Sequence, residues 1–119
     1  FDAARAQRAA AVVVAMQADM WPSQAPPGTT SGYDRIVARL ARRARAFRRP
    51  VLVLQGDSHH FKFDHPLRVG SGLHGVTTAA PNVIRVVVQG AASSPREWLR
   101  LHVTRTPEVF TWDRVRLNR

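Results

Sequence analysis

Two short apolar segments, separated by an amphipathic helix pattern, place the strongest constraint on the fold of this chain. Residues 9–17 (AAAVVVAMQ) and 51–55 (VLVLQ) are nearly unbroken apolar runs rich in valine. Such runs are typical of strands in a parallel sheet that is covered on both faces. Residues 1–8 resemble the last turns of a helix, so we expect the chain to begin within a structural element. Strand, helix and strand in this order predict a βαβ unit with two parallel strands.

The helix between the two strands is expected over residues 33–48, with one apolar stripe and a basic opposite face. The stripe consists of Tyr33, Ile36, Val37, Leu40, Ala44 and Phe47. Residues 33–49 contain seven arginines against one aspartate, and so hold +6 of the net charge of +10. We expect this face to be the solvated side of a helix that covers the sheet, and we do not expect it to bind nucleic acid. A non-enzymatic basic binding module that uses residues 33–49 is the alternative.

The pattern changes in the second half of the chain. Residues 83–89, 98–104 and 109–116 are expected strands, and their alternation predicts half-buried antiparallel hairpins joined by turns at 90–95 and 105–108. Residues 18–32 and 66–81 contain several prolines and glycines, which predicts loops. The fold class is therefore α/β with some α+β character: a βαβ unit with parallel strands, followed by antiparallel hairpins.

Composition excludes several classes of protein. The chain contains no cysteine, which excludes a disulfide scaffold and any thiolate metal site. No apolar run approaches the roughly 20 residues that a membrane-spanning helix needs. Neither observation indicates a cellular compartment.

Polar side chains follow both strands of the predicted parallel pair. Gln17 and Asp19 follow the first strand, and residues 56–60 (GDSHH) follow the second. Parallel sheets bind ligands at the carboxyl ends of their strands, so these side chains are expected at one edge of the sheet. Asp57 and His59 lie two positions apart, and in an extended segment they would point to the same side. A carboxylate together with an imidazole suits a divalent metal such as Mn, Fe or Zn.

The other histidines are expected to have structural roles. His65 and His74 lie in predicted loop segments, and His102 lies on the exposed side of a hairpin strand. Asp64, next to His65, is a further candidate ligand.

The ordered set of segments resembles the C-terminal half of calcineurin-like metallophosphoesterases, in particular a bacterial branch with a Gly-Asp-Ser/Thr-His signature. The segments that carry the likeness are VVVAMQAD, VLVLQGDSHHF, FDHPL, PNVIRVVVQG, REWLRLHVT and PEVFTWDRV. In the wider family, one strand end carries a metal-binding His and a later one carries Gly-His-x-His. On this alignment Gln17 occupies the position of the lone His, Asp57 replaces the first His of the pair, and His59 matches the second.

The resemblance implies a metal-dependent phosphoester hydrolase with a β-sandwich flanked by helices. Two divalent ions about 3.5–4 Å apart would hold the phosphoryl oxygens and activate a bridging water. By this likeness His59 is a metal ligand, Asp57 is a ligand or orients one, and His60 is the candidate proton donor to the leaving oxygen. Gln17 and Asp19 then contact the phosphate or support the ligands.

The resemblance also implies that the chain is one piece of a catalytic domain. The family's N-terminal motifs, Asp-x-His, Gly-Asp and Gly-Asn-His, are missing here, since the single Gly-Asp is residues 56–57. We therefore expect residues 1–119 to be a single partial domain, with the N-terminal half of the same domain and a phosphoester substrate as partners, and we do not expect the chain alone to be active. Two further alternatives are a degenerate, inactive metallophosphoesterase and a serine esterase built on Ser58. The esterase would need a separate downstream Asp-x-x-His, and that spacing occurs only from Asp57 to His60.

Overall fold

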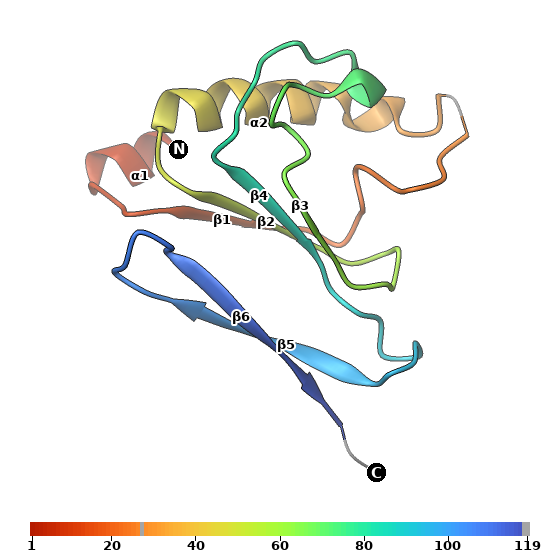
Figure 1. Ribbon diagram of the computed structural model, residues 1–119. Helices are drawn as coiled ribbons and strands as arrows, with labels where there is room; N and C mark the ends of the chain where they lie inside the picture. Colours follow the sequence, from red (N-terminus) through yellow and green to blue (C-terminus); the bar gives the residue numbers. More distant parts are fainter. Residues whose placement is uncertain (27, 118–119) are drawn as a thin grey trace.

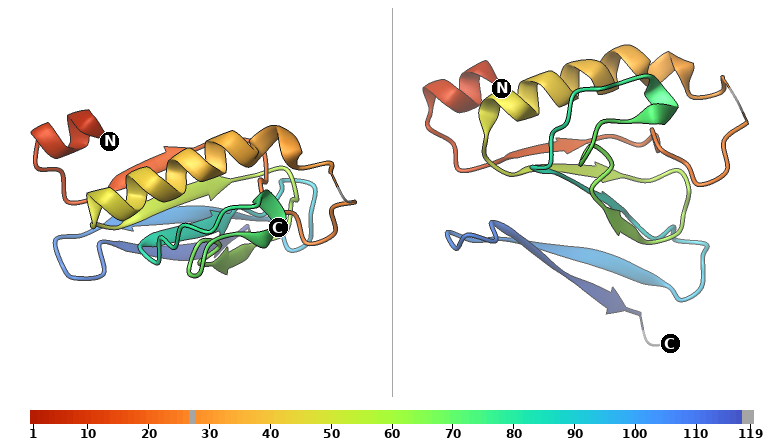
Figure 2. Two further views of the ribbon diagram at one scale, coloured as in Figure 1. Left: turned by 90° about the horizontal axis from the view of Figure 1, so that it is seen from above. Right: turned by 45° about the horizontal axis from the view of Figure 1, so that its top comes forward.

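The computed structural model describes residues 1–26 and 28–117, which form three layers (Figure 1). A helix lies over one face of a four-stranded sheet, and a two-stranded hairpin lies over the opposite face (Figure 2). The elements are α1 (Asp2–Ala6), β1 (Val12–Ala15), the 3-10 helix η1 (Ser31–Tyr33), α2 (Asp34–Phe47), β2 (Val51–Gln55), β3 (Lys62–Asp64), the 3-10 helix η2 (Gly72–His74), β4 (Val83–Val87), β5 (Glu97–Val103) and β6 (Phe110–Arg116). Within the described ranges, no helix has the length and apolar character needed to cross a membrane.

The four-stranded sheet contains the predicted βαβ unit. Its strand order is β1-β2-β4-β3; β1, β2 and β4 run parallel, and β3 runs antiparallel to β4. Val51 of β2 pairs with Val12 on one side and Val83 on the other, so β2 is a central strand. The α/β class and the parallel pair predicted from the sequence are confirmed.

Two predictions about the strands were wrong. Residues 83–87 were expected in an antiparallel hairpin with the strands that follow, but β4 pairs in parallel with β2 and antiparallel with β3, and β5 and β6 form a separate hairpin. β3 runs back along the sheet and the segment 66–81 follows it, so that β4 starts level with β2 and runs in the same direction. β1 was expected to be covered on both faces, but it is an edge strand, and Val13 is 44% exposed.

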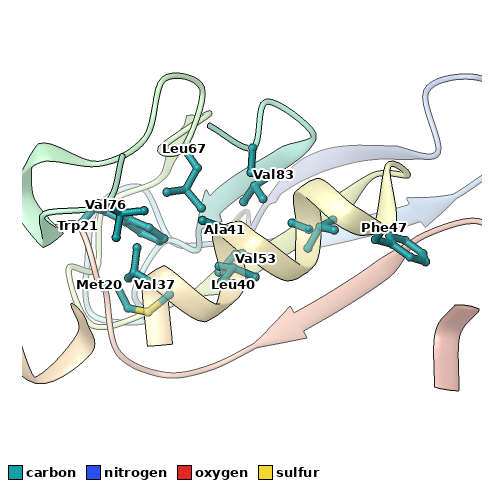
Figure 3. Close-up of a cluster of buried hydrophobic side chains, with 13 residues drawn as sticks. Met20, Trp21, Val37, Leu40, Ala41, Phe47, Val53, Leu67, Val76 and Val83 are labelled. Carbon is teal, nitrogen blue, oxygen red and sulfur yellow. The ribbon is translucent and has the colours of Figure 1, made fainter. Parts of the chain in front are cut away.

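The core between α2 and the sheet explains the position of the helix. Figure 3 shows apolar side chains of α2 packed against residues of the sheet and of the 66–81 segment. The buried helix residues are Val37, Leu40, Ala41, Ala44 and Phe47. Ile36, predicted in this stripe, is instead 51% exposed, because the helix turns the small Ala41 toward the sheet.

A second core fills the space between the sheet and the hairpin. It contains Leu52 and Val86 from the sheet and Val109 and Phe110 at the start of β6, with Leu99 packed against them. Alternate residues of β2 thus face different layers, which accounts for the unbroken apolar run at 51–54.

Candidate functional site

The carboxyl ends of β1 and β2 lie side by side at one edge of the sheet. The backbone N–H of Gly56 donates to the carbonyl oxygen of Gln17 at 3.0 Å. The amide Nε2 of the buried Gln55 donates to the carbonyl oxygen of Ala18 at 3.0 Å. The Gln17 side chain is exposed, beside a shallow apolar depression formed in part by Met16 and Leu54.

Residues 56–60 form the most unusual loop of this edge, and we call it the 56–60 loop. Asp57 and His59 have φ values of 61° and 59°, in the left-handed region. Their side chains and that of His60 are exposed. The sequence-based expectation of an extended segment was therefore wrong. Left-handed conformations of residues other than glycine cost about 1–3 kcal/mol each, and they cluster at functional sites.

The segment after β4 contributes a close contact to this loop. The N–H of Gly90 donates to the carbonyl oxygen of His59 at 3.0 Å. A Cβ atom at position 90 would lie 2.7 Å from both Cβ and Cγ of His59, so this packing requires glycine. The N–H of Phe61, just beyond the loop, donates to Oε1 of Gln89 at 2.9 Å. The ends of all three parallel strands thus meet at the loop.

Asp19 is buried, and its carboxylate bonds groups from three segments of the chain. It is 6% exposed, and its Oδ1 accepts from the Trp21 N–H at 2.9 Å and from Nη1 of Arg85 at 2.8 Å. Its Oδ2 accepts from the hydroxyl of Ser58 at 2.5 Å. Asp19 was predicted to contact the substrate or support the ligands, and this role stays a prediction.

Arg85 lies at the centre of this polar network, and the sequence reasoning missed it. Arg85 is 1% exposed on β4, and its guanidinium forms a bidentate pair with Asp64, from Nε to Oδ1 at 2.8 Å and from Nη2 to Oδ2 at 2.5 Å. Asp64, a candidate ligand, is therefore occupied by an ion pair. The available signal was an arginine within a run of buried valines, because a buried charge needs a partner.

Of the three histidines expected to have structural roles, His65 is partly buried, and its Nδ1 has no hydrogen-bond partner among the described residues. His74 is buried in η2, with Nδ1 2.7 Å from Oδ1 of Asp34 and Nε2 2.7 Å from the carbonyl oxygen of Met20. His102 lies exposed on β5, with Nε2 2.8 Å from Oδ2 of Asp113.

The residues at the loop fit part of a metal site. Asp57 and His59 offer one carboxylate and one imidazole on an exposed loop, and these groups suit divalent transition metals. Within residues 1–26 and 28–117, no group of three or more His, Asp or Glu side chains is arranged to hold a metal ion. Catalytic zinc sites use three protein ligands, so Asp57 and His59 can form only part of such a set.

No protein-family model, no curated protein and no solved structure matches the chain.

Proposed function

We propose that this chain supplies the C-terminal part of the active site of a metal-dependent phosphoester hydrolase of the calcineurin-like kind. The observation that carries the proposal is the strained, exposed 56–60 loop at the carboxyl edge of three parallel strands. Asp57 and His59 hold left-handed conformations there, with side chains open to solvent. Ligands of parallel sheets bind at this edge, and the sequence likeness supplies the reaction class.

The residues of the loop take separate roles in this proposal. Asp57 and His59 bind a divalent ion such as Mn, Fe or Zn, which when bound polarises phosphoryl oxygens and lowers the pKa of water. His60, exposed on the same loop, gives a proton to the leaving oxygen. The exposed amide of Gln17 donates a hydrogen bond to the phosphoryl group.

The proposal assigns the remaining ligands to the N-terminal half of the same domain. Asp57 and His59 bind a single ion weakly, because two protein ligands leave most of its coordination to water. The chain alone is therefore expected to bind metal and phosphate without turning over a phosphoester.

The test is a titration of the chain with MnCl₂ by calorimetry. Wild type is expected to bind Mn²⁺ saturably, and His59→Ala is expected to lose at least about tenfold in affinity, because a ligand is lost. His102→Ala is the matched control, since it also removes an exposed histidine and leaves the loop untouched. A second measurement follows the ³¹P relaxation of inorganic phosphate, which should respond to the Mn²⁺-loaded wild type more than to His59→Ala. Absence of saturable Mn²⁺ binding, or equal affinities for wild type and His59→Ala, would refute the proposal.

A further inference from the structure

We propose that Arg85 is a positioning residue for this site, and that it holds the 56–60 loop through Asp19 and Ser58. Its functional meaning rests on the proposed metal site. Neither Arg85 nor Ser58 takes part in the chemistry proposed above.

The position of the Arg85 guanidinium is fixed by its surroundings. Two carboxylates flank it, Asp64 on one side and Asp19 on the other, and Nη1 also donates to the carbonyl oxygen of Trp21 at 2.9 Å. The guanidinium carbon lies 5.5 Å from the centre of the Trp21 ring. A forked, planar cation suits this arrangement because it can bond two acceptors in fixed directions. Arg85 thus joins β4, β3 and the segment after β1.

Asp19 connects the Arg85 guanidinium to the 56–60 loop. One carboxylate oxygen of Asp19 bonds Arg85, and the other accepts the Ser58 hydroxyl at 2.5 Å. Ser58 stands between the two left-handed residues, Asp57 and His59. Hydrogen bonds to a charged acceptor are roughly twice as strong as neutral ones, so this bond is a firm anchor.

The other long-range anchors of the loop join backbone atoms and lie toward its ends. Gly56 donates to the carbonyl of Gln17, and the carbonyl of His59 accepts from Gly90. Among the described residues, the Ser58–Asp19 bond is the side-chain hydrogen bond that reaches the middle of the loop. Removal of the Ser58 hydroxyl therefore leaves the backbone anchors in place and frees the segment that sets the directions of Asp57 and His59.

Removing Arg85 itself has a broader effect. Asp19, which is 6% exposed, would remain buried without its cation, and an uncompensated buried charge is strongly destabilising. Ser58 is the sharper target because its replacement changes the loop contact and keeps the ion pair between Arg85 and Asp19.

The experiment compares Mn²⁺ affinity and urea stability in Ser58→Ala, Ser58→Thr and Ser31→Ala. Ser31→Ala is the matched control, because Ser31 also donates one loop hydrogen bond, to the carbonyl of Gly28 at 2.8 Å, away from the site. Ser58→Ala is expected to lose about 10-fold to 100-fold in Mn²⁺ affinity, as is usual when a group that orients a ligand is removed. Its urea midpoint should fall below that of Ser31→Ala, because the buried Asp19 carboxylate loses a donor, and Ser58→Thr should restore it. Ser58→Thr keeps the hydroxyl and should restore most of the affinity.

A second arm uses Arg85→Lys, alone and combined with Ser58→Ala. If Arg85 acts through Asp19 and Ser58, the double variant loses no more affinity than Ser58→Ala alone, whereas independent effects would add. If Arg85→Lys does not fold, Ser58→Ala and Ser58→Thr still decide the proposal.

The outcomes separate the two proposals. Saturable binding that is lost in His59→Ala and unchanged in Ser58→Ala overturns the role of Arg85 and leaves the metal site standing. No saturable binding by wild type overturns the metal site, and the positioning role with it.

Discussion

Replacing Gly90 by alanine is expected to destabilise the protein and to weaken metal binding by one and the same displacement. The added Cβ would lie 2.7 Å from Cβ and Cγ of His59 and 3.1 Å from Cδ2. Carbon atoms in contact are about 3.5–4.0 Å apart, so the two segments must separate by roughly 0.8 Å. Rotation of the His59 ring cannot relieve the clash, because the position of its Cβ is set by the backbone.

The magnitude follows from the nature of this contact. The Gly90 N–H to His59 carbonyl bond of 3.0 Å joins the same two residues, so separating them also stretches that bond. Overpacking of this kind costs about 1–3 kcal/mol. Domains of this size are stable by about 5–15 kcal/mol, so the variant remains folded and its loss of stability can be measured.

Urea unfolding followed by circular dichroism measures this change, and calorimetry with MnCl₂ measures the effect on the loop. Gly72→Ala is the matched control, because a Cβ atom at position 72 meets nothing within 4 Å. We expect Gly72→Ala to lie within about 0.5 kcal/mol of wild type. If Gly90→Ala is as stable as Gly72→Ala and binds Mn²⁺ equally well, the close contact between Gly90 and His59 does not restrict position 90 to glycine.

Two further predictions concern packing and charge. Leu52→Ala leaves a cavity in the core beneath the hairpin, where Leu52 is 0% exposed, and should lower the free energy of unfolding in urea by about 2–5 kcal/mol. Leu73 is 46% exposed, so Leu73→Ala should lower it by roughly 0.5 kcal/mol or less. Equal losses would contradict the burial of Leu52 in the core beneath the hairpin. Arg43→Ala removes an ion pair with Asp2 at 2.8 Å whose side chains are 39% and 75% exposed, so its cost should be about 0–1 kcal/mol and should vanish in 1 M NaCl; a loss that persists at high salt would indicate a packing role for Arg43.

Local pattern predicted the parallel unit because the relevant signals are close in sequence. The apolar run at 51–55 became β2 with the same bounds, and the helix pattern became α2. The pairing of β4 could not be predicted in this way, because it depends on where the 66–81 segment returns the chain. β3 is three residues long, Lys62–Asp64, and is too short to show an alternation.

The sequence predicted that the candidate site lies at the ends of the parallel strands, but it did not predict the conformation of the loop. The position of the 56–60 loop follows from the rule for parallel sheets. Asp and His adopt left-handed conformations more often than most residues other than glycine, but the sequence does not indicate that both Asp57 and His59 do so in this loop. The inward turn of Asp19 depends on Arg85, which is 66 positions away in the chain and is held by the fold.

The hairpin packs on the sheet through a core of its own, so its free energy of opening can differ from that of the whole molecule. A two-stranded hairpin alone is at best marginally stable in water, so β5 and β6 depend on docking against Leu52 and Val86. Such a unit opens at a lower free energy than the whole molecule, and it can leave the sheet while α2 stays packed. The chain that leads from β4 into the hairpin passes through Gly90, directly against His59. Undocking of the hairpin would therefore pull directly on the segment at Gly90 that packs against the 56–60 loop.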